Sequence, residues 1–134
     1  KKLFKICDII KYNLKKYDWV GFYFSDLINK QLKLIAFSGE ETEHTIIPFG
    51  KGVCGQVANS NKPLIITDVK SEKNYISCNI NVKSEIVVPI LIDNINIGQI
   101  DVDSNTINAF SNMDKIFLEE ICELVSKNYD LNKN

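Results

Sequence analysis

The stretch SEIVVPILIDNINIGQIDVD (residues 84–103) decides the fold class of this 134-residue chain. Two apolar, β-branched runs are separated by the pair Asp93-Asn94, and residues of these types favour a turn. The stretch therefore predicts an antiparallel hairpin with strands at 84–92 and 95–103. Pro89 lies inside the first strand and cannot donate to a ladder, so we expect a sheet edge or a bulge there.

The same periodicity rules, applied outward from the hairpin, predict an α+β domain that includes all residues 1–134. The expected elements are a helix at 2–16, strands at 19–25, 32–37, 44–48 and 64–67, a helix near 53–60, and a last helix capped by Ser111, with an apolar stripe of Ile116, Phe117, Ile121, Leu124 and Val125. Antiparallel hairpins dominate this order, so the terminal helices should pack together on one face of one sheet. The other face should carry the long loops and the ligand.

Composition narrows the partners. Hydrophobic residues make up 45% of the chain, the formal net charge is −1, and all sixteen basic residues are lysines. Without arginine or a basic stripe, nucleic acid is a poor candidate, and no guanidinium is present to hold an anion. No apolar run is long enough to span a membrane and no signal peptide is visible, so we expect a cytoplasmic protein. Since the sequence does not begin with Met, some N-terminal residues are expected to be missing.

The four cysteines fall into two pairs. Cys7 and Cys122 lie on the apolar stripes of the terminal helices, where a free thiol acts as a small core residue. Cys54 and Cys78 lie outside such patterns and are the candidates for chemistry, although a loop cysteine is also tolerated without a role. Cys54 stands where a helix begins, and unpaired N–H groups there would stabilise a thiolate. In a reducing cytosol we expect all four thiols to be free.

Acidic residues gather on one face of the second hairpin strand. Alternation places Gln99, Asp101 and Asp103 together, and Glu85 on the partner strand could join them. Carboxylates this close repel one another, so at least one pKa should be raised, which suits cation binding or general acid catalysis. A solvated strand end is the alternative. No further oxygen-ligand pattern supports a metal, so we predict none.

Two single residues have a structural and a functional interpretation. Trp19, at the start of a strand, is more typical of a core than of a substrate wall. His44, the only histidine, is expected to be a surface residue on the short strand 44–48.

Four motifs occur in order along nearly the whole chain. They are WVGFY (19–23), PFGKGVCG (48–55), Cys78 followed by SEIVVPI (84–90), and GQIDVDS (98–104). Together they resemble the GAF-domain free methionine-(R)-sulfoxide reductases. The resemblance implies a GAF fold with an antiparallel sheet of about six strands. It also implies reduction of free methionine-(R)-sulfoxide, with thioredoxin as the external reductant and no bound cofactor.

The resemblance also assigns roles to matching positions. Cys78 matches the catalytic cysteine, Trp19 matches a tryptophan beside the substrate, and the substrate-site acids are matched by Glu85, Asp101 and Asp103. The family usually has a third cysteine where this chain has His44. Two routes of recycling therefore stay open: Cys54 resolves the oxidised Cys78, or thioredoxin attacks it directly.

The chemistry of the residues fits these roles. A Cys78 thiolate would attack the sulfoxide sulfur while an acid, most plausibly Glu85, protonates the oxygen. Asp101 and Asp103 suit the substrate ammonium, and Trp19 and Tyr23 would hold the methyl thioether. Backbone N–H groups in residues 50–55, or near Cys78, could bind the carboxylate.

Two other functions stay open for the same sequence. The domain could be a non-catalytic GAF sensor of a small ligand, or a thiol redox switch in which Cys54 and Cys78 pair without substrate. The terminal helices could also mediate a homodimer.

Overall fold

The computed structural model describes residues 1–75 and 80–129. In chain order the elements are α1 (Lys2–Asn13), β1 (Trp19–Asp26), β2 (Gln31–Ser38), β3 (Ile46–Pro48), α2 (Gly52–Ser60), β4 (Leu64–Ile66), the 3-10 helix η1 (Val69–Ser71), β5 (Ser84–Ile92), β6 (Ile95–Ser104) and α3 (Asn112–Lys127).

The strands form one sheet in the order β3-β2-β1-β6-β5-β4, and all neighbours run antiparallel. The hairpin predicted from the sequence is formed by β5 and β6, which close with Ile92 opposite Ile95. Asp93 and Asn94 between them have φ of 52° and 66°. Aspartate and asparagine tolerate this left-handed conformation better than most residues, so the turn suits this pair.

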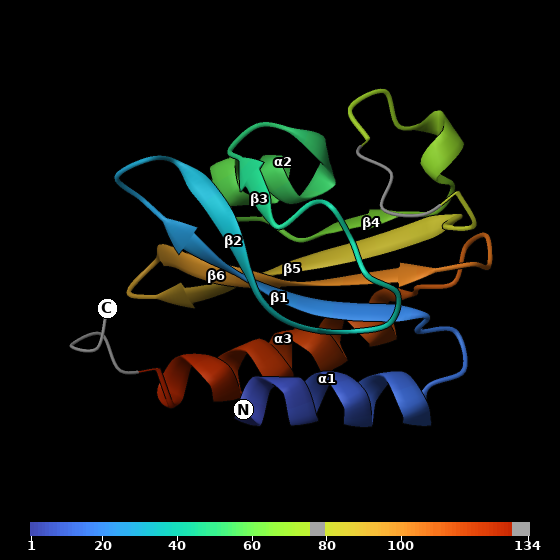
Figure 1. Ribbon diagram of the computed structural model, residues 1–134, viewed down its shortest axis with the longest axis horizontal. Helices are drawn as coiled ribbons and strands as arrows, with labels where there is room; N and C mark the ends of the chain where they lie inside the picture. The colour runs from blue at the N-terminus through green and yellow to red at the C-terminus, as the bar shows by residue number, and fades with distance from the viewer. Residues whose placement is uncertain (76–79, 130–134) are drawn as a thin grey trace.

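Helices α1 and α3 lie together on one face of the sheet, whereas α2 and η1 lie on the other (Figure 1). The α+β prediction with paired terminal helices is thus confirmed. Cys7 and Cys122 belong to the core between the helices and the sheet, as expected, and burial raises the pKa of each thiol to about 12. The core on the α2 side includes Trp19, Tyr23 and Cys54.

Helix α3 begins as predicted but turns a different face inward. The Ser111 side chain accepts from the Met113 N–H, and Asp114 completes a capping box by accepting from the Ser111 N–H. The residues that become buried are Leu118, Cys122 and Val125, whereas Ile116 and Leu124 of the expected stripe are 43% and 58% exposed. Packing against β5 selects this face, because Cys122 then reaches the Val88 carbonyl.

Two element boundaries differ from the sequence prediction. Helix α1 ends at Asn13 rather than at residue 16, because Leu14 adopts an extended conformation. Strand β3 begins at Ile46 rather than at 44, so the half-buried His44 precedes the strand and is not a surface residue within it.

Strand β4 is half-buried rather than buried, because it is the short edge strand of the sheet. It pairs with residues 85–87 of β5 only, so Pro89 lies on the part of β5 that β4 does not reach. The register shifts just beyond it, between Ile90 and Leu91. The expectation of an edge or a bulge at Pro89 is therefore confirmed.

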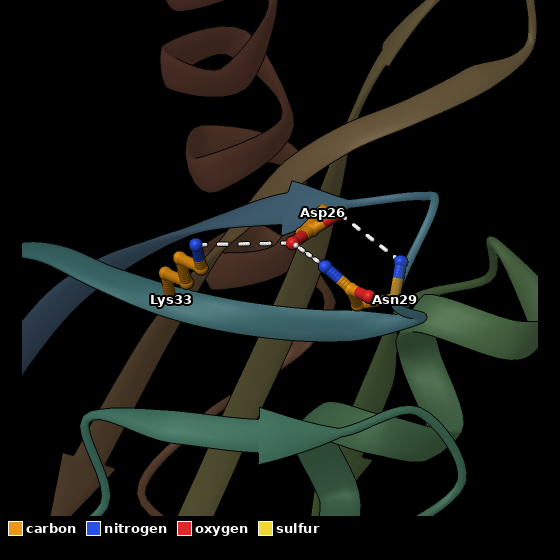
Figure 2. A network of polar contacts seen from close by, with 3 residues as sticks. All are labelled: Asp26, Asn29 and Lys33. Atoms are coloured by element: carbon orange, nitrogen blue, oxygen red, sulfur yellow. Dashed lines mark hydrogen bonds and ion pairs between the residues drawn. The ribbon is translucent and has the colours of Figure 1, made fainter.

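The β1–β2 connection is held by one carboxylate (Figure 2). Asp26 accepts from the Asn29 backbone N–H at 3.1 Å and from the Asn29 side chain at 2.8 Å, and Lys33 approaches to 3.8 Å. The Asn29 hydrogen bonds, more than Lys33, lower the pKa of Asp26. This turn positions β2 beside β1 and leaves the other end of the pair to form the site.

Across residues 1–75 and 80–129, every helix is too short or too polar to cross a membrane.

Candidate active site

Three acids come together on the sheet face that α2 covers. Asp101 and Asp103 lie on β6, and Glu85 lies on β5 directly opposite Asp103. The alternation predicted from the sequence is therefore confirmed. Their exposed fractions are 1%, 2% and 5%, so the alternative of a solvated strand end is wrong.

Helix α2 places Cys54 beside these acids. The Sγ atom of Cys54 and one carboxylate oxygen each from Glu85 and Asp101 lie within 4.8 Å of one another. The helix is fastened to the middle of β6 because the buried Gln99 side chain donates a 2.9 Å hydrogen bond to the Cys54 carbonyl. The thiol and the carboxyls thus share one closed environment.

Burial dominates the electrostatics of this cluster. Desolvation, followed by the charges of Asp101, Glu85 and Asp103, raises the pKa of Cys54 well above its usual value. The expectation of a thiolate stabilised by the helix N-terminus is wrong, because burial beside three acids outweighs the few N–H groups of one short helix. Desolvation also raises the pKa of Asp101, and desolvation with the charge of Asp101 raises the pKa of Asp103.

The acid row still has acceptors to offer. Within the described part of the chain, Oδ1 of Asp101 and Oδ1 of Asp103 are buried and have no hydrogen-bond partner. Buried polar atoms without partners are costly, which favours a ligand that brings donors or positive charge. Cys54, Glu85 and Asp101 are also the one group, among the described residues, with the spacing to hold a metal ion. The prediction of no metal stays a prediction.

Trp19 forms a wall next to the acid row. Its ring stacks on Phe37 at 5.7 Å between centroids, and its Nε1 donates to the Glu40 carbonyl at 3.0 Å. A hollow of about 380 Å³ is lined by Trp19 together with Asp103, and by Lys11, Tyr12, Asp18, Gly39, Glu40, Glu41, Asn81, Val82 and Asn105. Trp19 is therefore both a core residue and a wall of this hollow.

Tyr23 shares the sheet face of Trp19, as predicted, but does not line this hollow. It is completely buried, and its hydroxyl donates a 2.8 Å hydrogen bond to the His44 carbonyl. The structure therefore brings Trp19 and the acids together at the hollow and places Tyr23 deeper, beneath the segment that leads to β3.

The glycine-rich segment is less available to a ligand than the sequence suggested. The N–H groups of Gly50, Lys51 and Gly55 donate to backbone carbonyls, and that of Gly52 donates to the Asn74 side chain. These four amides cannot also bind a carboxylate, so this part of the expected carboxylate site is corrected.

Sequence reasoning missed Asn74, which lies in a polar loop without a pattern. It also gave Gln99 no role beyond its place on the acid face. Both act through contacts with residues 22 or more positions away, and no local signal reveals such contacts. Cys78, the predicted nucleophile, lies outside the described residues.

Comparison with known proteins places the fold. The model of the GAF domain family matches residues 6–128. The chain belongs to the GAF domain family. The expected GAF fold, with its six-stranded antiparallel sheet, is thus confirmed.

Within that family the chain is similar to free methionine-R-sulfoxide reductases. It is 35% identical to the reductase of Saccharomyces cerevisiae and 34% identical to that of Escherichia coli, covering 82% of this chain in each case. The matches span 62% and 65% of those two proteins, which is less than two thirds of their length.

Solved structures agree with these sequence matches. The type II reductase of Thermoplasma acidophilum superposes with a TM-score of 0.90 at 39% identity, covering 94% of this GAF domain and 88% of that chain. The reductase of Neisseria meningitidis, in complex with its substrate, gives 0.88 at 34% identity, covering 93% and 74%.

Proposed function

We propose that this GAF domain reduces the R epimer of free methionine sulfoxide to methionine. The observation that carries the proposal is the buried acid row beside the Trp19 hollow, where Oδ1 of Asp101 and Oδ1 of Asp103 lack partners. A free amino acid brings an ammonium that would satisfy both oxygens, whereas a blocked or peptide-bound one would not. The similarity to named reductases supports the same substrate.

The reaction uses Cys78 as the nucleophile. Its thiolate attacks the sulfoxide sulfur, Glu85 hydrogen-bonds or protonates the departing oxygen, and methionine leaves while Cys78 becomes a sulfenic acid. The thiol of Cys54 then forms a disulfide with Cys78 and the oxygen leaves as water. Thioredoxin returns both cysteines to thiols by exchange. The alternative route, direct attack of thioredoxin on the sulfenic acid, omits Cys54.

The hollow accounts for the rest of the substrate. The indole of Trp19 supplies an apolar surface for the methyl thioether, with Tyr23 behind it in the same core. The substrate carboxylate would meet Lys11, which is the one cation among the described residues that line the hollow.

The test of this function uses single-turnover assays on both epimers of the free amino acid and on its N-acetyl derivative. Cys78→Ser should abolish consumption of the free R epimer, and wild type should leave the S epimer and the N-acetyl compound unchanged. Unaltered turnover in Cys78→Ser would overturn the proposal. Equal reduction of the N-acetyl compound would show that the acid row does not select the ammonium.

Mass spectrometry of thiols after one turnover decides the recycling route. If Cys54 resolves, wild type should carry a disulfide, and Cys54→Ser should carry a persistent sulfenic acid on Cys78. Identical products in both proteins would favour direct attack by thioredoxin.

We also propose a cytoplasmic homodimer. The described cysteines Cys7, Cys54 and Cys122 are free thiols, which suits a reducing compartment. Helices α1 and α3 expose Ile9, Tyr12 and Leu124, at 63%, 77% and 58%. Light scattering should give twice the monomer mass for wild type and a lower mass for Ile9→Lys. A monomeric wild type would exclude the dimer.

A further inference from the structure

Asn74 joins two segments that are far apart in the sequence. Its Oδ1 accepts a 2.8 Å hydrogen bond from the Gly52 N–H, and its Nδ2 donates at 2.9 Å to the Gly50 carbonyl. The Gln56 side chain adds a longer contact of 3.4 Å to the Asn74 carbonyl. One side chain therefore holds both sides of the turn from which α2 starts.

The turn needs such a partner because α2 has no local cap. Lys51 occupies the N-cap position and makes no side-chain hydrogen bond to the helix. Gly50 and Gly52 have φ of 89° and 68°, a region that favours glycine, and glycine cannot supply a capping side chain. The free N–H groups of a first helical turn are normally met by the N-cap residue. Here Asn74 does this for the Gly52 N–H from another segment.

The position of Asn74 gives this cap a second consequence. Helix α2 carries Cys54 in its first turn, and Asn74 precedes Cys78 by four residues. A chain of four residues spans at most about 14 Å, so the point where Asn74 is fastened limits how far Cys78 can lie from α2.

We propose that Asn74 is a positioning residue, which keeps the segment leading to Cys78 at the first turn of α2 so that Cys54 and Cys78 can pair. The inference rests on the proposed function and concerns its resolution step. In that step the Cys54 sulfur bonds to the Cys78 sulfur of the sulfenic acid, and the S–O bond breaks. The oxygen leaves as water with the Cys54 proton. Fastening the segment raises the effective concentration of one thiol at the other.

The test measures the equilibrium between the dithiol and the Cys54–Cys78 disulfide in reduced and oxidised glutathione, with peptide mapping to assign the disulfide. Asn74→Ala should lower the equilibrium constant about tenfold, because two hydrogen bonds that hold the segment are lost. Asn74→Asp should stay within about threefold of wild type, because a carboxylate still accepts from Gly52 and suits a helix N-terminus. Asn128→Ala, which removes an exposed side-chain bond in α3, is the matched control and should be neutral.

The outcomes separate positioning from general stability. Thermal melts should shift by similar small amounts in Asn74→Asp and Asn74→Ala, whereas the disulfide constant should differ between them. An unchanged constant in Asn74→Ala, equal loss in both variants, or no Cys54–Cys78 disulfide in wild type would each overturn the inference. Failure of the proposed function would appear elsewhere, as a wild type that forms this disulfide in glutathione but consumes no methionine sulfoxide.

Discussion

The indole of Trp19 lies across Gly21, two residues further along the same strand. A Cβ at position 21 would come within 2.3 Å of a ring carbon, far inside van der Waals contact. Gly39 allows an equally close approach from the other side, because a Cβ there would lie 2.6 Å from the ring. The wall of the hollow therefore depends on two glycines that leave room for one side chain.

Gly21→Ala should move the indole and damage the hollow. Overpacking at this position should lower the free energy of unfolding by about 2 kcal/mol and raise KM for the sulfoxide several-fold. Gly98→Ala is the matched control, since a Cβ there would lie 2.4 Å from the Tyr23 carbonyl, away from the hollow. Denaturant melts should show similar losses in both variants, and only Gly21→Ala should change KM. An equal KM in the two variants would contradict the role of Gly21.

Asp103→Asn should stabilise the ligand-free protein at neutral pH. Because the native pKa of Asp103 is raised, the native state holds its proton at pH values where the unfolded state has lost it. The free energy of unfolding therefore falls as pH rises above about 4, and the amide avoids this loss. We expect a gain of about 1–3 kcal/mol at pH 7 that fades below about pH 4, measured by urea unfolding.

Asp26→Asn provides the opposite sign as a control. Asn29 lowers the pKa of Asp26, so its charge favours the native state above about pH 4. Removing that charge should destabilise the protein slightly at pH 7 and have no effect at low pH. Equal pH profiles for Asp26→Asn and Asp103→Asn would mean that burial does not control Asp103.

The contrast between these acids shows what the sequence could predict. Alternation along a strand is fixed by the backbone, so the shared face of Asp101 and Asp103 followed directly from the sequence. The position of Cys54 above them depends on how α2 docks, and Gln99 determines this from a strand 45 residues away. The thiolate prediction failed for the same reason, because a helix terminus is a local feature and burial is not.

The inward face of α3 and the wall at Trp19 required the structure as well. Several residues of α3 are apolar, and only the contact of Cys122 with Val88 selects which face turns inward. The sequence likewise offered Trp19 as core or as substrate wall. It could not decide, because both the stacking on Phe37 and the hollow beside Asp103 arise from neighbours on other strands.

Lys11→Met should weaken binding of the substrate carboxylate. We expect KM for free methionine-(R)-sulfoxide to rise about tenfold with kcat little changed, since a charged hydrogen bond is lost outside the reacting atoms. The amide of methionine sulfoxide, which lacks the carboxylate, should show no such difference between Lys11→Met and wild type. Lys5→Met on the exposed face of α1 is the control. A tenfold effect on both substrates would exclude a carboxylate contact.

Ser111→Ala should separate folding from function. Loss of the capping box at α3 should lower the free energy of unfolding by about 1 kcal/mol, with kcat/KM unchanged, because the cap lies on the helical side of the sheet. Ser126→Ala, which removes an exposed bond to Glu123 late in the same helix, should cost less. Thermal melts and steady-state kinetics of the two variants provide the comparison. An activity loss in Ser111→Ala beyond its stability loss would connect α3 to the site.

The wall of the hollow also contains the only tryptophan of the chain. Emission excited at the red edge of protein absorption therefore comes from one indole, which stacks on Phe37 beside Asp103. A ligand that enters the hollow should change the polarity around that ring and shift its emission. The protein thus contains a built-in optical reporter, and a titration would follow occupancy of this one place without any label.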